Sequence, residues 1–293
     1  MNIASKLAGM VPQSWIGGIS HARWKHPWLR HLLEPVSRSF KNRDMTMQHG
    51  IGAGLRFNAG DSQPGYALGV SEPGVQKILE SFVKPGMTVY DGGANVGFLS
   101  ILLARLVGPG GRVVSFEPLP DNADRIESNA RLNGFGHLVV RREALAGADG
   151  RSTFFLGEMS TRGLLQTVFI KPDQMERNSI EVSVRSLDSL AAEGVPAPDF
   201  VKLDVEGAEA DTLRGGSDLL RRARPILMIE LHDTNAAAAE ALNDLDYRPV
   251  VLGCPGQSVA EAHWNAIVLA VPKEKADLVA ALDAFNQRVK ITR

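Results

Sequence analysis

One short stretch of this sequence, residues 89–97, restricts the fold more than any other. It reads Val-Tyr-Asp-Gly-Gly-Ala-Asn-Val-Gly, and a helix-like apolar segment, Phe98–Val107, follows it. A second strand-like segment, Arg112–Phe116, then ends at Glu117. This order of strand, glycine-rich turn, helix and strand is typical of doubly wound parallel sheets, in which ligands bind at the carboxyl ends of the strands.

The spacing within this turn separates two classes of ligand. A dinucleotide site has the pattern Gly-x-Gly-x-x-Gly, which brings the backbone close to a pyrophosphate. Here Asp91, Gly93, Asn95 and Gly97 give Asp-x-Gly-x-Asn-x-Gly instead. A carboxylate at Asp91 repels a pyrophosphate and favours a cation. S-adenosylmethionine (SAM) has an amino group and a sulfonium but no phosphate, so we expect it as the cofactor, with its carboxylate facing the positive end of the following helix.

Two further strand ends supply candidate cofactor contacts. Glu117 ends the second strand, where a carboxylate suits the two ribose hydroxyls of an adenosine. Glu143 and Ala144 end a third strand over 138–142, where the adenine would lie. The carboxylate of Glu143 can accept from the exocyclic amine and the amide of Ala144 can donate to a ring nitrogen. A solvated loop glutamate explains Glu143 equally well.

A fourth core strand is expected over 199–204, and the acidic segment 204–209 at its end carries the first group of candidate catalytic residues. Asp204 can contact the methionine amine, orient the acceptor or act as a base, and Glu206 can bind acceptor hydroxyls. Glu209 is more typical of a helix N-terminal charge. Because carboxylate oxygens suit magnesium, a metal site is an alternative at this edge, although we predict none.

A fifth core strand is expected over 225–231, and Glu230 and His232 lie at its end. Period-two alternation places both side chains on one side of the strand, with Glu230 expected to contact the acceptor. Histidine is the natural general base near neutral pH, which makes His232 a candidate catalytic base. The alternative is a histidine that is hydrogen-bonded for structural reasons.

Composition narrows the class of protein. The 293 residues are enough for one large α/β domain with additions. The formal net charge of −1 gives no global field that would attract nucleic acid, so we expect no nucleic-acid partner. Cys254 is the only cysteine, which excludes an internal disulfide and a cysteine-rich zinc site. No stretch has the apolar length to span a bilayer or the long apolar region of a secretory signal, so we expect a cytoplasmic protein.

The first part of the chain differs from the rest. Residues 1–44 are rich in basic residues and contain Trp15, Trp24 and Trp28. We expect a helical extension over 1–49, which either packs on the main domain or contacts a membrane surface or partner. The main domain is expected over 50–293, with a loop or lid over 157–179.

These motifs together resemble the FkbM family of SAM-dependent methyltransferases, over residues 50–271. The resemblance rests on four stretches: 89–97, Phe-Glu-Pro at 116–118, Lys-Leu-Asp-Val-Glu-Gly-Ala-Glu at 202–209, and Ile-Glu-Leu-His at 229–232. It implies a class I (Rossmann-like) fold with a mostly parallel seven-stranded sheet and an antiparallel last strand. Tyr66, Gly69 and Glu72 resemble the family's upstream element, which implies that they cover the methionine end of SAM. Gly92 departs from the family, in which a bulkier apolar residue is more usual.

The same resemblance implies an activity and an acceptor. We expect O-methylation of a hydroxyl on a sugar, glycolipid or polyketide-like natural product, with a small-molecule or a glycan- or lipid-linked acceptor. N-methylation, metal-assisted O-methylation and non-catalytic SAM binding are the alternatives, and the oligomeric state, including a homodimer, stays open. If residues 1–44 contact a membrane, the protein is peripheral to its inner face.

Overall fold

The computed structural model describes residues 40–156, 163–165 and 179–288. Most of the predicted helical extension and of the predicted lid therefore lies outside the described residues. The part of the extension that is described packs on the main domain, because Phe40, Met45 and Met47 are buried in its core. A short hairpin there joins β1 (Met45–Thr46) to β2 (Arg56–Phe57).

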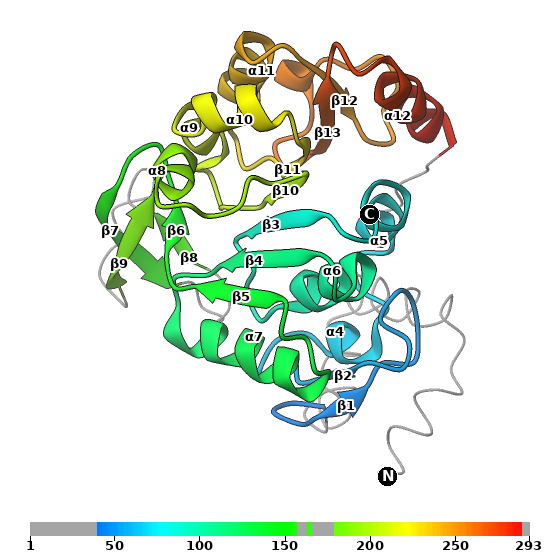
Figure 1. Ribbon diagram of the computed structural model, residues 1–293, viewed down its shortest axis with the longest axis vertical. Coiled ribbons are helices and arrows are strands. Elements are labelled where there is room, and N and C mark those ends of the chain that lie inside the picture. The colour runs from blue at the N-terminus through cyan, green and yellow to red at the C-terminus, as the bar shows by residue number, and fades with distance from the viewer. Residues whose placement is uncertain (1–39, 157–162, 166–178, 289–293) are drawn as a thin grey trace, which may run out of the picture.

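The centre of the molecule is a seven-stranded sheet in the order β12-β13-β11-β10-β3-β4-β5 (Figure 1). The five strands from β11 to β5 pair in parallel, and β13 pairs antiparallel with both β11 and β12. This confirms the predicted class I methyltransferase fold. In chain order the strands are β3 (Thr88–Gly92), β4 (Arg112–Phe116), β5 (Leu138–Arg141), β10 (Phe200–Leu203), β11 (Ile226–Glu230), β12 (Tyr247–Val251) and β13 (Ile267–Pro272).

Helices cover both faces of this sheet, which explains why its inner strands are apolar without alternation. One face packs against α5, α6, α7 and α12, and the other packs against α8, α9, α10 and α11 (Figure 1). Successive residues divide between the two layers, so Val89 faces the first and Tyr90 the second. The helices are α5 (Pro73–Phe82), α6 (Phe98–Val107), α7 (Pro120–Leu132), α8 (Leu187–Ala192), α9 (Glu209–Arg214), α10 (Ser217–Ala223), α11 (Asn235–Asp244) and α12 (Ala276–Arg288).

A second, four-stranded sheet lies beyond β5, in the order β6-β9-β7-β8. Its strands are β6 (Ala144–Leu145), β7 (Gly150–Leu156), β8 (Gly163–Leu165) and β9 (Ser179–Arg185). β7 and β9 pair antiparallel with each other. Two short helical segments, α4 (Pro64–Leu68) and the 3₁₀ turn η2 (Val259–Glu261), complete the described elements.

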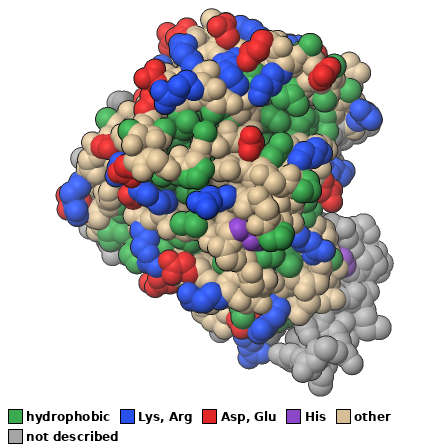
Figure 2. All heavy atoms as spheres, viewed as in Figure 1, with side chains coloured by type: hydrophobic (Ala, Val, Ile, Leu, Met, Phe, Trp, Pro, Cys, Tyr) green, Lys and Arg blue, Asp and Glu red, His purple; other side chains and the backbone are tan. Residues whose placement is uncertain are grey.

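The surface carries charges of both signs. On the face shown in Figure 2, lysine and arginine side chains are interspersed with aspartate and glutamate and do not gather into one basic patch. This agrees with the net charge of −1, and the absence of a nucleic-acid partner stays a prediction. In the described part of the chain, no helix has the length and apolar character needed to cross a membrane.

Candidate active site

The glycine-rich turn joins β3 to α6 through an unusual backbone path. Gly93, Asn95 and Gly97 all have positive φ, of 71°, 54° and 84°, a region that glycine tolerates and most residues avoid. At Gly93 a Cβ would also lie 1.8 Å from the carbonyl oxygen of Asp204. The turn therefore packs directly on the segment after β10, and only glycine fits at its first position.

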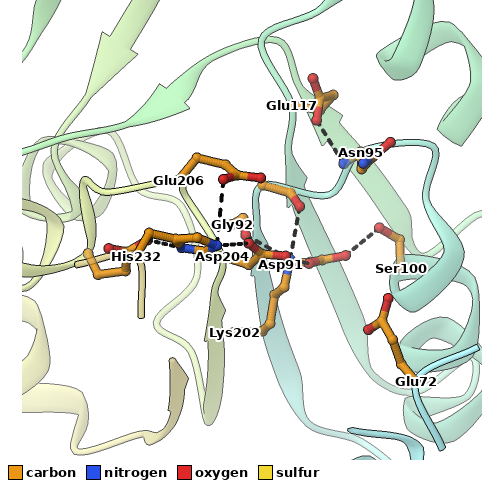
Figure 3. Close-up of polar contacts among 12 residues, drawn as sticks. Glu72, Asp91, Gly92, Asn95, Ser100, Glu117, Lys202, Asp204, Glu206 and His232 are labelled. Atoms are coloured by element: carbon orange, nitrogen blue, oxygen red, sulfur yellow. Dashed lines mark hydrogen bonds and ion pairs between the residues drawn. The ribbon is translucent and has the colours of Figure 1, made fainter. Parts of the chain in front are cut away.

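Glu117 lies beside this turn, as the sequence predicts. One carboxylate oxygen accepts from the Asn95 amide at 2.7 Å (Figure 3). The other accepts from the Leu119 amide at 2.9 Å. Glu117 is only 4% exposed. Burial raises the pKa of Glu117 to about 7, although these hydrogen bonds lower it. The Asn122 side chain also donates to it at 3.5 Å. Because two carboxylate oxygens offer about four acceptor sites, one site remains for a ligand.

A cavity, partly open to solvent, lies at the carboxyl ends of β3, β4 and β10. Its lining includes six of the predicted site residues: Gly93, Asn95, Glu117, Ala144, Asp204 and Glu206. The rest of the lining is mostly apolar and comes from Phe116, Pro118, Leu119, Asn122, Leu145, Phe154 and Val205.

Asp91 is placed differently from its predicted role. It is fully buried, beneath the turn and outside the cavity lining. Its Oδ2 accepts from the Ser100 hydroxyl at 2.6 Å, and its Oδ1 lies 3.3 Å from the ammonium of Lys202 (Figure 3). The cation that this carboxylate favours is therefore a lysine of the protein itself. Asp91 supports the turn from below.

Lys202 is the residue that sequence reasoning missed. It belongs to the Lys-Leu-Asp motif, and the signal that indicates it is a lysine inside an otherwise apolar strand. Buried lysines are rare unless they are paired. Lys202 donates to two backbone carbonyls of the turn and also lies 3.5 Å from Asp204.

Glu143 and Gly97 also lie outside the cavity lining. Glu143 receives two hydrogen bonds from Arg141, at 2.7 and 3.2 Å, and lies 3.9 Å from Arg185. Two cations of the protein therefore pair with this carboxylate, and its predicted contact with the adenine stays a prediction. Gly97 begins α6, and a Cβ there would lie 2.9 Å from Ile126 of α7. Its role is close packing between two helices.

Tyr66 and Glu72 form the predicted upstream element. The Tyr66 hydroxyl donates to Glu72 at 3.2 Å, and its ring stacks on Phe98 at 4.7 Å between centroids. Glu72 precedes α5 with a φ of 53°. Burial, with the negative charge of Asp204, raises the pKa of Glu72 to about 7. Contact of this pair with the methionine end of SAM stays a prediction.

His232 lies behind Asp204 and Glu206, outside the cavity lining. Its Nδ1 is 3.0 Å from the fully buried Glu209, and its Nε2 is 3.7 Å from Asp204 and 3.5 Å from Glu206 (Figure 3). Burial lowers the pKa of His232, but the Glu209 hydrogen bond and the surrounding carboxylates outweigh it and raise the pKa to about 9. The imidazole therefore carries a proton at neutral pH, and Glu209, expected only as a helix-end charge, is its partner.

Glu230 belongs to the acidic side of the site, together with the three carboxylates around His232, which are those of Asp204, Glu206 and Glu209. Burial and the charge of Asp204 raise the pKa of Glu230 to about 7. One ligand atom from each of Asp204, Glu206 and His232 lies within 4.8 Å of the others. This set has the chemistry of a divalent-cation site as well as that of an ion-pair network.

Comparison with known proteins identifies the class. Residues 91–249 match the model of the methyltransferase FkbM domain, and the chain belongs to that family of SAM-dependent methyltransferases. This confirms the family and the cofactor that the sequence predicted.

Three relatives match about half of the chain. It is 26% identical over 162 residues to the hexuronic acid methyltransferase AglP of Haloferax volcanii, covering 55% of this chain and 62% of AglP. It is 30% identical over 188 residues to the 31-O-demethyl-FK506 methyltransferase FkbM of Streptomyces tacrolimicus, covering 55% and 71%. It is 31% identical over 198 residues to the AMB antimetabolite synthetase AmbE of Pseudomonas aeruginosa, covering 55% of this chain but only 9% of that protein.

Among solved structures, the chain is similar to a methyltransferase FkbM from Methylobacillus flagellatus KT. The TM-score is 0.44 at 19% identity, over 63% of this chain and 43% of that one.

The residues present fit SAM. The cavity offers an open glycine turn and a carboxylate at the end of β4, which suit a ribose, and the apolar side chains of Phe116, Leu145 and Phe154, which suit an adenine ring. The described lining contains no lysine or arginine that would pair with a pyrophosphate. Gly93, Asn95, Glu117 and Ala144 are therefore the residues that would hold the cofactor.

Proposed function

We propose that this protein transfers a methyl group from SAM to a hydroxyl of a sugar, glycolipid or polyketide-like acceptor. One observation carries the proposal: the carboxylates of Asp204 and Glu206 line the same cavity as the cofactor residues Gly93 and Glu117. An acceptor hydroxyl bound by these carboxylates would lie beside the methyl donor. The relatives named for a hexuronic acid and for a 31-O-demethyl compound support an oxygen acceptor.

The chain's contribution is mainly alignment. SAM, when bound, supplies a methyl group that is already activated. The turn at Gly93 and the carboxylate of Glu117 would hold the donor, while Asp204 and Glu206 would orient the acceptor. Such positioning can supply roughly 7–11 kcal/mol of the barrier reduction.

Asp204 is our candidate for the group that accepts the hydroxyl proton. It faces the cavity, whereas His232 lies behind it and carries a proton at neutral pH. We assign to His232 the role of a cation that holds Asp204 and Glu206 toward the acceptor. Glu230, on the same side, would contact the acceptor's remaining polar groups.

Metal-assisted O-methylation is the second candidate, favoured by the spacing of Asp204, Glu206 and His232. A divalent cation on these side chains would bind the acceptor oxygen and favour its deprotonated form. Turnover measured after EDTA treatment, with and without added magnesium, separates the two: unchanged turnover supports Asp204 as base, and loss restored by magnesium supports the metal.

The remaining partners follow from the acceptor. A lipid-linked acceptor would suit a cytoplasmic protein whose residues 1–44 touch the inner face of a membrane. Flotation with anionic vesicles, with and without residues 1–44, tests this contact, and no flotation of either form would refute it. Sedimentation of the full chain tests the homodimer.

The activity is tested with SAM that carries an isotopically labelled methyl group. The purified protein is incubated with methyl hexuronides, neutral methyl glycosides and amino sugars, and the products are analysed by mass spectrometry. Label on oxygen supports the proposal, and label on the amine alone supports N-methylation. If SAM binds but no acceptor in an extract of the source cells is labelled, a non-catalytic SAM-binding protein is the better description.

A further inference from the structure

Lys202 is a buried cation at the centre of the site. It lies in β10 among four consecutive buried residues, and it is 4% exposed. A lysine at such a position carries a large desolvation cost unless its three N–H donors are used and its charge is balanced. Its ammonium donates two hydrogen bonds to backbone carbonyls and lies within 3.5 Å of two carboxylates, which offset this cost.

The ammonium bonds directly to the cofactor turn. Its Nζ donates to the carbonyl oxygen of Gly92 at 3.0 Å and to that of Gly93 at 2.9 Å (Figure 3). These carbonyls belong to the last residue of β3 and the first residue after it. The lysine therefore fixes the orientation of two peptide planes at the point where the chain leaves the sheet.

The same ammonium also contacts the acids on either side of that point. Asp91 lies 3.3 Å and Asp204 3.5 Å from Nζ. Burial lowers the pKa of Lys202, but the charges of Asp91, Asp204 and Glu72 outweigh it and raise the pKa above its ordinary value, so the ammonium stays charged.

Strand pairing explains why one side chain reaches both elements. β10 pairs in parallel with β3, with Lys202 opposite Asp91 and Leu203 opposite Gly92. Beyond the strands, the Asp204 amide donates to the Gly92 carbonyl at 3.2 Å. The Gly92–Gly93 turn and the segment that carries Asp204 thus leave the sheet side by side.

We propose that Lys202 is a positioning residue, which holds the Gly92–Gly93 turn in its SAM-binding geometry and sets the Asp204 carboxylate beside it. This inference rests on the proposed function for the role of Asp204, but its effect on the turn is separate. A lysine present only to balance Asp91 would have no such effect on the cofactor.

The test separates positioning from charge balance. Lys202→Met leaves Asp91 buried without a counter-charge, so we compare Asp91→Asn with the double variant Asp91→Asn plus Lys202→Met. S-adenosylhomocysteine (SAH) affinity is measured by calorimetry, and amide hydrogen exchange is followed at Ala94 and Asn95. Thermal unfolding is measured to check that both variants are folded.

We expect the double variant to bind SAH at least tenfold more weakly than Asp91→Asn, with at least tenfold faster exchange at both amides. Equal SAH affinity and equal exchange in the two variants would overturn the proposal. If the double variant does not fold, Lys202→Arg is compared with wild type instead. This substitution keeps the positive charge but changes the arrangement of the N–H donors. If removal of the lysine weakens SAH binding but the wild-type protein methylates no hydroxyl, the proposed function is refuted and this inference stands.

Discussion

Gly93 offers the sharpest test of the cofactor turn, because a single methyl group should disrupt it. Its φ of 71° is unfavourable for alanine, at a cost of roughly 1–2 kcal/mol. In addition, the new Cβ would lie 1.8 Å from the Asp204 carbonyl oxygen and 2.9 Å from its carbonyl carbon. These are backbone atoms that cannot rotate away, so the turn itself must move, at a further cost of about 1–3 kcal/mol.

Gly134 provides a matched control. It has nearly the same φ, 68°, at the end of α7, and a Cβ there meets no atom within 4 Å. Gly134→Ala should therefore carry the conformational cost alone, and Gly93→Ala that cost plus the displacement of the turn. For a domain of this size, each kcal/mol lowers Tm by about 2–4 °C.

SAH titration should separate the two variants further. If moving the turn costs 2–3 kcal/mol of cofactor binding, affinity falls by roughly 30- to 150-fold in Gly93→Ala. Gly134→Ala should bind SAH like wild type. Wild-type affinity in a folded Gly93→Ala protein would refute the placement of the cofactor on this turn.

Three other predictions follow from the site and its surroundings. Because Glu117 is ionised only above its pKa of about 7, SAH affinity should fall about tenfold from pH 8 to pH 6, and calorimetry should show a flat profile in Glu117→Gln; a flat wild-type profile would contradict this. Asp204→Asn should lower kcat by roughly 10²–10⁴-fold while single-turnover assays show SAM still bound, and an unchanged kcat would remove Asp204 as the base. Arg224→Ala loses hydrogen bonds to the Leu245 and Asp246 carbonyls, so denaturant unfolding should show a loss of about 2 kcal/mol without a change in SAH affinity.

The parts of this fold that could be predicted are those encoded locally. The turn at 89–97 and Glu117 follow one another along the chain, and both lie where the spacing predicts. The strand and helix alternation gives the central sheet, because parallel strands joined by helices leave few arrangements. The pairing of β7 with β9 was not predicted, since nothing local states which edge each strand would join.

The roles that could not be predicted depend on partners distant in the sequence. Asp91 looks like a ligand for a cationic cofactor until Lys202, which is 111 residues later, is placed beside it. His232 looks like a neutral base until the buried Glu209 raises its pKa. In each case the sequence identifies the residue and its strand end, but its role depends on a contact that only the folded chain brings together.

The most direct test of the central claim is calorimetric titration of SAH and of NADH into the wild-type protein. The turn and Glu117 predict micromolar binding of one SAH per chain and no detectable binding of NADH. Binding of NADH with comparable affinity, or no binding of SAH, would contradict the assignment of this cavity to SAM.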